Sequence, residues 1–374
     1  MKYSDIFFVL YCRDDKKAYR KGTEERMKKR YRLRYDRVMI VAALTVLLIT
    51  AILLLFHGCS KKEQKTKVVP EAVQAEVTTA VAEAEYTTAA EATTTALAET
   101  TVTTTAAQLI PQIEYPECKA SALYDVKEKK LLYGDSIDMQ IAPASLTKLI
   151  TASVALKYSE MSEVYTVGSE QWLVNEYSSV CGVVQGNMAT LGDLITGMLM
   201  ESGNDAAYTI AVSIARESSG NENMSDTEAV NYFCGLMNSF AKELGMTGTH
   251  FVNPDGWDAD GQYTTAADLL KIAEYVLSVP QLREIVGTYQ KTVTFYTGES
   301  FTWTNSNLLL DPYSEYYRSD AIGMKTGTTL NAGNSLIAAF EKNGKEYITV
   351  AAGCLTDEMR FELTHKLISY TDEN

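Results

Sequence analysis

An uncharged apolar run from Val38 to Phe56 limits what this chain can become more than any other stretch. The run holds 19 residues, mostly Leu, Ile, Val and Ala, and a helix of that length spans the hydrocarbon layer of a membrane. The alternative is a buried core helix, but no charged residue interrupts the run. We therefore expect a single membrane anchor over residues 38–57.

The charges on the two sides of this run predict its orientation. Residues 1–37 carry 13 Lys and Arg against 6 Asp and Glu, a net charge of +7, and since the whole chain carries −14 the remainder carries −21. Lys and Arg concentrate on the cytoplasmic side of membranes, so we expect a basic cytoplasmic segment over residues 1–37 and the rest outside the cell. So long a basic region favours a retained anchor over a cleaved signal. The stretch before Cys59 invites comparison with a lipoprotein cleavage site, but the bulky His57 counts against it.

Residues 58–112 are dominated by Thr, Ala, Glu and Val and show no hydrophobic periodicity. Such a segment buries too little apolar surface to offset the entropy of ordering it. We predict a disordered linker that holds the next domain away from the membrane. Residues 113–374 then form one folded domain, long enough to bury a core of its own.

Cysteine and histidine usage argues against a metal centre. The six cysteines form no Cys-x-x-Cys pair and no zinc spacing, and the chain has only His57, His250 and His365. We therefore expect no metal and no other cofactor. The net negative charge of the part outside the membrane argues against nucleic acid as a partner.

Four cysteines fall in the folded domain: Cys118, Cys181, Cys234 and Cys354. Their spacing neither supports nor excludes a disulfide. Cys354 ends an apolar run, so we expect it to be a small buried hydrophobic side chain.

The domain itself is organised around the stretch that begins at Pro143. Proline suits the first turn of a helix, and Leu146 and Ile150 recur at helical spacing. Ser145 and Lys148 then share one face, near the positive end of the helix dipole. That field and burial disfavour the ammonium form, so Lys148 could accept the hydroxyl proton of an activated serine. Taken alone, a Ser-x-x-Lys pair on a helix is more often chance.

Periodicity along the domain predicts strands at both of its ends and helices between them. The expected strands are residues 120–126, 130–134, 323–329, 335–340 and 346–353, and the expected helices after the Ser145 helix are residues 191–200, 206–216, 228–244, 266–279 and 357–370. This order indicates an α+β domain in which one five-stranded antiparallel sheet is built from both domain ends, with a helical lobe between and a cleft where the two meet.

Two further groups of polar residues accompany this architecture. Ser202 and Asn204 lie in a short connection between two predicted helices, where the plain alternative is helix capping. Lys325, Thr326 and Gly327 lie on a predicted strand. There the glycine would admit a substrate backbone and the other two side chains could bind a carboxylate. The plain alternative is a strand edge guarded by a lysine.

In this order and on these elements, Ser145-x-x-Lys148, Ser202-x-Asn204 and Lys325-Thr326-Gly327 resemble the three-motif set of serine penicillin-recognising enzymes. The neighbouring residues narrow the resemblance to the D-alanyl-D-alanine carboxypeptidases, which are low-molecular-mass penicillin-binding proteins; these are Asp125, Leu132-Tyr133, Pro143-Ala144, Asp205-Ala206-Ala207, Leu244-Gly245-Met246, Phe251-x-Asn253-Pro254 and Gly323-Met324. The resemblance covers about residues 115 to 372. It implies the penicillin-binding protein or serine β-lactamase-like fold.

The resemblance also implies a catalytic role for three side chains. Ser145 would attack the carbonyl between the two terminal D-alanines of a peptidoglycan stem peptide, form an acyl-enzyme and release one D-alanine. Lys148 would be the base for acylation. Ser202 would relay a proton toward the leaving amine.

The remaining implied roles concern substrate binding. Asn204 would hold the substrate amide, and Lys325 and Thr326 would receive the terminal carboxylate. The backbone N–H groups of Ser145 and Thr328 would form the oxyanion hole. Arg360 would lie near the carboxylate end, as an arginine often does in the family. β-Lactams would act as covalent inhibitors.

The sequence departs from the family pattern in two places. Relatives usually have Asn-Pro-His-Gly-Leu where this chain has Asn253-Pro254-Asp255-Gly256-Trp257, so the cleft rim or the packing there can differ. Many relatives also carry a C-terminal β-domain and an amphipathic membrane helix, for which the expected N-terminal anchor would substitute.

Other functions would use parts of the same motif set. A class A β-lactamase needs a Glu for deacylation in a Glu-x-x-Leu-Asn-like loop, which the sequence lacks. A D,D-endopeptidase that cleaves crosslinks uses the same chemistry and stays open. A β-lactam sensor would want a larger cytoplasmic module than residues 1–37, and a wall-binding module would not need both lysines. A tethered monomer is the expected state.

Overall fold

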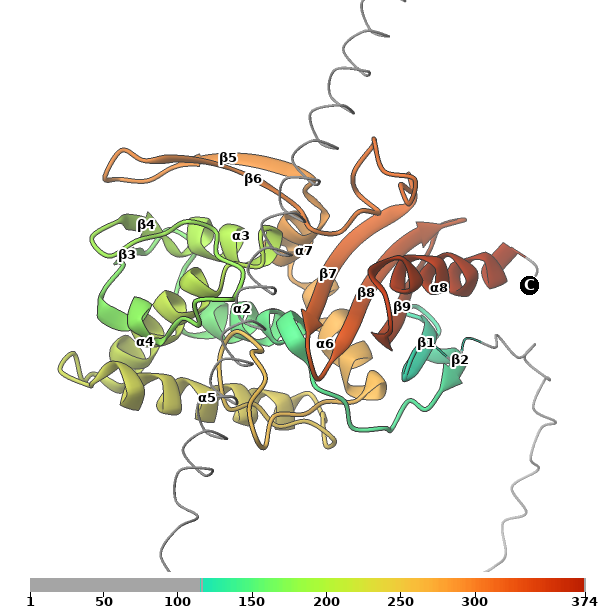
Figure 1. Cartoon of the computed structure of the whole chain (residues 1–374), viewed down its shortest axis with the longest axis horizontal. Helices are drawn as coiled ribbons and strands as arrows, with labels where there is room; N and C mark the ends of the chain where they lie inside the picture. Colours follow the sequence, from blue (N-terminus) through green and yellow to red (C-terminus); the bar gives the residue numbers. More distant parts are fainter. Residues whose placement is uncertain (1–114, 116, 373–374) are drawn as a thin grey trace, which may run out of the picture. The chain divides into compact units, whose positions relative to one another are not determined.

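Strands from the two ends of the domain lie side by side in one sheet (Figure 1). The computed structural model describes residue 115 and residues 117–372. The expected cytoplasmic segment, anchor and linker therefore lie outside the described residues. Within residues 115 and 117–372, no helix combines the length and the apolar character that crossing a membrane requires.

The main sheet has five antiparallel strands in the order β2-β1-β9-β8-β7. Two further two-stranded antiparallel sheets are formed by β3 with β4 and by the hairpin β5-β6. The strands are β1 (Ala120–Asp125), β2 (Lys130–Asp135), β3 (Val164–Thr166), β4 (Met188–Thr190), β5 (Gln290–Thr294), β6 (Ser300–Thr304), β7 (Ala321–Thr329), β8 (Gly333–Lys342) and β9 (Lys345–Cys354). The predicted sheet built from both domain ends is confirmed.

The helices between β2 and β7 form the lobe, and one more follows β9. They are α2 (Thr147–Tyr158), α3 (Leu191–Met200), α4 (Asn204–Ser219), α5 (Asp226–Glu243), α6 (Ala266–Ser278), α7 (Pro280–Gly287) and α8 (Asp357–Ser369), with 3-10 turns at η1 (Ala144–Leu146), η2 (Ser169–Leu173) and η3 (Tyr370–Asp372). Side chains of Thr190, Ser225, Thr265 and Thr356 accept hydrogen bonds from the first turns of α3, α5, α6 and α8, which sets where these helices begin.

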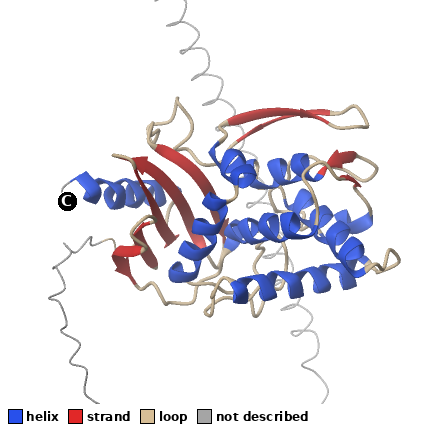
Figure 2. Ribbon diagram, turned by 180° about the vertical axis from the view of Figure 1, so that it is seen from behind, coloured by secondary structure: helices blue, strands red, loops and turns tan. Residues whose placement is uncertain are grey.

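The sheet has a hydrophobic core on each face because successive side chains of β8 point in opposite directions. Leu336, Ala338 and Phe340 pack in a cluster with Phe361 and Leu367 of α8. Ile337 and Ala339 join the larger cluster that the lobe helices form. Figure 2 shows α8 on one side of the sheet and the lobe on the other. This second interface, between sheet and lobe, places β7 beside η1.

Three local features differ from expectation. Ser145 lies in the 3-10 turn η1, and the α-helix begins only at Thr147. The β5-β6 hairpin, which packs on α3 through Trp303 and Gly197, and the helix α7 were not predicted. Cys354 is buried but not a free hydrophobic side chain, since it forms a disulfide with Cys118.

Candidate active site

Ser145 and Lys148 form the centre of the site. Lys148 Nζ donates to Ser145 Oγ at 2.8 Å and to the backbone carbonyl of Asp255 at 2.7 Å. The lysine is fully buried, whereas Ser145 is partly exposed. Ala144, directly before the serine, has a positive φ of 49°, an unfavourable conformation for a side-chain-bearing residue. The serine hydroxyl is thus open to a ligand and touches an amine held inside the protein.

The environment of Lys148 favours its neutral form. Burial lowers the pKa of Lys148 to about 8, although the nearby carboxylates of Asp255 and Asp205 act in the opposite direction. At neutral pH roughly a tenth of the amine is therefore deprotonated, and a deprotonated amine 2.8 Å from a hydroxyl can accept its proton.

The connection between α3 and α4 contributes Ser202 and Asn204. Ser202 is 8% exposed and has a positive φ of 60°. The N-cap of α4 is Gly203 and uses no side-chain hydrogen bond, so neither Ser202 nor Asn204 serves as the cap. The capping alternative is therefore wrong.

Asp205 holds this connection in place. Its carboxylate accepts from the backbone N–H groups of Cys181, Gly182 and Val183 at 2.8 to 3.0 Å. The backbone N–H of Asn204 donates to the Ser179 carbonyl at 2.8 Å. These bonds fix the start of α4 against the preceding loop.

Asp255 contacts both Lys148 on α2 and Asn204 at the start of α4. Its carbonyl binds Lys148, as above, and its carboxylate Oδ2 accepts from Asn204 Nδ2 at 2.5 Å. Asp255 is 1% exposed, and burial raises the pKa of its carboxyl group, against the opposing influence of Lys148. Sequence reasoning noted this residue only as a departure at the cleft rim. The signal available was an acidic residue where relatives usually have histidine.

Strand β7 lies at the edge of the main sheet and packs against η1, the turn that carries Ser145. Because it ends the sheet, one side of its backbone has no strand partner and can pair with an extended ligand. A Cβ at Gly327 would lie 3.1 Å from Ala144 Cβ and 3.2 Å from Ser145 N, so glycine permits this strand to approach the serine turn itself. The backbone N–H groups of Ser145 and Thr328 belong to these two adjoining segments.

Lys325 and Thr326 lie on this strand and are both buried. Burial lowers the pKa of Lys325 well below its usual range, and the charges of Lys148 and Arg360 add to the effect. The Thr326 hydroxyl pairs with the Ser306 hydroxyl at 2.7 Å. Ser306 was missed from the sequence because its segment, which connects β6 to β7, carries no periodicity.

Arg360 supports β7 from α8. Its Nη1 donates to Gly327 O and Thr328 Oγ1, both at 3.3 Å, and to Ser335 O at 3.1 Å, and it forms an ion pair with Asp357. It thus contacts the strand that carries Lys325 and Thr326.

Within residues 115 and 117–372, no three His, Cys, Asp or Glu side chains gather closely enough to hold a metal ion. The structure brings together Ser145, Lys148, Asn204, Gly327 and Lys325 by short contacts or mutual electrostatic influence. Ser202 adjoins them along the chain. Such a set can form an acyl-enzyme on Ser145.

Comparisons with known proteins find one family over most of the chain. Residues 102–356 match the family model described as D-alanyl-D-alanine carboxypeptidase. DacC of Escherichia coli K12 is 33% identical over 270 residues, which are 69% of this chain and 62% of that protein. DacF of Bacillus subtilis is 28% identical over 259 residues, 68% of this chain and 62% of that protein. The chain therefore spans less than two thirds of these two relatives.

A third relative, a D-alanyl-D-alanine carboxypeptidase of Streptomyces sp. K15, is 31% identical over 249 residues, 64% of this chain and 81% of that protein. The crystal structure of the Streptomyces K15 DD-transpeptidase superposes with a TM-score of 0.63 at 27% identity. That match covers 69% of this chain and 98% of that one.

Proposed function

We propose, since the chain belongs to the D-alanyl-D-alanine carboxypeptidase family, that it removes the terminal D-alanine from peptidoglycan stem peptides. The observation that carries this proposal is the buried amine of Lys148, with a pKa of about 8, 2.8 Å from the hydroxyl of the partly exposed Ser145. A serine hydroxyl activated by a neighbouring base in this way can attack the carbonyl of a peptide bond.

In the proposed acylation, Lys148 Nζ takes the Ser145 Oγ proton while Oγ bonds to the penultimate D-alanine carbonyl carbon. The oxyanion is stabilised by the N–H groups of Ser145 and Thr328, and each such donor is typically worth about 3 kcal/mol of barrier. When the C–N bond breaks, the proton passes by way of Ser202 to the leaving amine. Water then hydrolyses the ester and restores Ser145.

Substrate binding in this proposal uses β7. The stem peptide would lie extended along its open edge, with its terminal carboxylate toward Lys325 and Thr326 and an amide held by Asn204. Ser306 and Arg360 support it, because the first orients the Thr326 hydroxyl and the second binds Gly327 and Thr328. A β-lactam would acylate the same serine.

The proposal extends to location and assembly. Residues 38–57 would anchor the protein in the cell membrane with its N-terminus in the cytoplasm, residues 58–112 would act as the linker, and the domain 113–374 would work at the cell wall as a monomer.

The test is release of free D-alanine from diacetyl-lysyl-D-alanyl-D-alanine by the full-length protein, beside Ser145→Ala and a fluorescent penicillin. We expect turnover and a stable penicillin adduct, both lost with Ser145→Ala. A penicillin adduct without D-alanine release would contradict carboxypeptidase activity and favour the D,D-endopeptidase or sensor alternatives.

The same assay with an added amine acceptor tests a second function. The structural neighbours named DD-transpeptidases share this fold at 27 to 28% identity. Because any amine can attack the acyl-enzyme in place of water, transfer to the acceptor at the expense of hydrolysis would identify a transpeptidase.

A further inference from the structure

One residue, Asp255, joins two motifs that come from different helices. Its backbone carbonyl accepts from Lys148 Nζ, and its carboxylate accepts from Asn204 Nδ2. A buried carboxylate 2.5 Å from an amide nitrogen makes a strong hydrogen bond. Nothing in the three-motif set assigns a role to this position.

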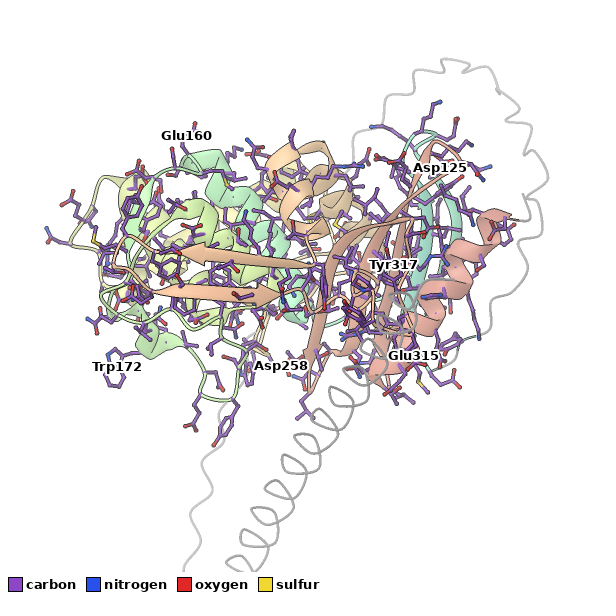
Figure 3. All side chains as sticks on the ribbon, turned by 90° about the horizontal axis from the view of Figure 1, so that it is seen from above. Asp125, Glu160, Trp172, Asp258, Glu315 and Tyr317 are labelled. Atoms are coloured by element: carbon purple, nitrogen blue, oxygen red, sulfur yellow. A yellow bond between two sulfur atoms is a disulfide. The ribbon has the colours of Figure 1, made fainter. Side chains whose placement is uncertain are left out.

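The loop that carries Asp255 is held on several sides. The Thr151 hydroxyl donates to the Pro254 carbonyl at 2.6 Å, and the Gly256 N–H donates to Asn253 Oδ1 at 2.8 Å. Further along, Asp258, labelled in Figure 3, accepts from the Thr329 hydroxyl at 2.6 Å. The loop is therefore tied to α2 and to the end of β7, and Asp255 has little freedom to move.

The chemistry of a carboxylate decides how the Asn204 amide is turned. An ionised carboxylate only accepts hydrogen bonds, so it faces the NH₂ end of the amide. The Asn204 oxygen is left buried and has no hydrogen-bond partner among the described residues. That oxygen is enclosed as well as unpaired, so an N–H of a substrate can bind it only after a local movement uncovers it. A histidine at this position could donate as well as accept and would not impose this orientation.

We propose that Asp255 is a positioning residue for acylation, which orients the Asn204 amide through its carboxylate and holds Lys148 through its carbonyl and its charge. This inference rests on the proposed function. It adds that substrate recognition by Asn204 depends on a residue outside the three motifs.

Three buried groups near Asp255 and Lys148 keep their protons over the pH range in which Lys148 titrates. Burial raises the pKa of Cys181 and Tyr208 strongly, and raises that of Cys234 to about 12. Asp205, on α4, and Lys325, on β7, are the remaining charged neighbours of Lys148. Both residues are kept in every Asp255 variant, and the NMR titration described below follows Lys148 separately from Lys325.

The test measures the rate of acylation by a fluorescent penicillin against pH, using the full-length protein. At high pH, where Lys148 is neutral, the acylation rate reaches a plateau, and the height of this plateau reports on Asn204. At lower pH the rate falls as Lys148 becomes protonated, and the midpoint of this fall reports on Lys148. For Asp255→Asn we expect a plateau about 10- to 100-fold lower, since a charge-assisted hydrogen bond is lost. We also expect the midpoint to move to lower pH, because a negative charge beside the ammonium form is gone.

Three matched variants sharpen the result. Asp260→Asn removes an exposed carboxylate from the same loop and should leave plateau and midpoint unchanged. Asp255→His places a side chain that can both donate and accept at this position, and it should move the midpoint in the same direction as Asp255→Asn. In an Asn204→Ala background, Asp255→Asn should lower the plateau little further, because the group it positions is already missing.

A plateau of the acylation rate that is unchanged in Asp255→Asn would overturn the proposal. A midpoint that moves in neither Asp255→Asn nor Asp255→His would overturn it as well. Thermal unfolding of each variant identifies any that fails to fold, and Asp255→His then replaces Asp255→Asn. NMR titration of Lys148 in ¹³C-lysine-labelled protein gives the midpoint without any acylation. The inference can thus fail while D-alanine release stands, or survive when D-alanine release is absent.

Discussion

At the scale of single residues, the burial of Lys148 sets the pH dependence of the reaction. Its pKa of about 8 lies below the ordinary lysine value of 10.5, and the base must be neutral to act. We therefore expect kcat/KM for D-alanine release, and penicillin acylation, to rise with pH through a midpoint near 8. A rate that stays flat from about pH 6 to 9 would contradict the role of Lys148.

The substitution Lys148→Arg tests whether Lys148 acts as a base or only as a positive charge. Lys148→Arg keeps a cation that does not deprotonate, so acylation should fall by at least about 100-fold at every pH. Lys157→Arg, on the same helix but ion-paired to Glu243 at its surface end, should keep the wild-type rate. Penicillin labelling measures both, and retention of activity by Lys148→Arg would exclude proton transfer to this side chain.

At the scale of elements, Gly256 lets the loop that carries Asp255 pack closely against η1, the turn that carries Ser145. It has a φ of 89°, and a Cβ there would lie 1.7 Å from the Ala144 carbonyl oxygen. Gly256→Ala must push the loop away from Ser145, so we expect a loss of about 2–5 kcal/mol in unfolding free energy. Activity should fall about 100-fold, as small displacements of reacting groups do.

Gly261 supplies the matched control for that substitution. Its φ of 82° is nearly the same, but the nearest atom to an added Cβ lies 3.9 Å away. Gly261→Ala should cost only the positive-φ strain, about 1–2 kcal/mol, with kcat/KM unchanged. Equal effects of the two substitutions on denaturant unfolding and on kcat/KM would show that backbone strain, not contact with Ala144, matters.

The Cys118–Cys354 disulfide links the chain just before β1 to the end of β9, across a sequence separation of 236. Reduction should lower the unfolding free energy by about 2–5 kcal/mol. The double variant Cys118→Ser with Cys354→Ser should show the same loss and no further response to reductant. Denaturant midpoints measure this, and a wild-type midpoint indifferent to reductant would argue against a stabilising bridge.

At the scale of the whole molecule, the elements that the sequence predicted correctly are those marked by short local patterns, such as a capping residue before a helix. Helices α3, α6 and α8 begin where the sequence indicated, because Thr190, Thr265 and Thr356 each cap a first turn. Contacts between distant segments were not readable. Asp255 meets Asn204 51 residues away, and a cysteine pair 236 apart has no local mark. The β5-β6 hairpin did have a signal, in the alternation that buries Val293 and Trp303 and leaves Thr292, Thr294 and Thr302 exposed.

The last prediction concerns attachment of the chain as a whole. Residues 38–57 are free of charge, and an arginine near the middle of a membrane helix costs about 3 kcal/mol. We expect the protein to stay with membranes through an alkaline wash, and Leu47→Arg with Leu48→Arg to release it.

Thr87→Arg with Thr88→Arg adds the same charge in the expected linker and should leave the protein attached to the membrane. Both variants should be acylated by penicillin at the wild-type rate, because the catalytic groups all lie beyond residue 140. Wild-type protein in the wash supernatant would contradict the anchor without touching the chemistry at Ser145.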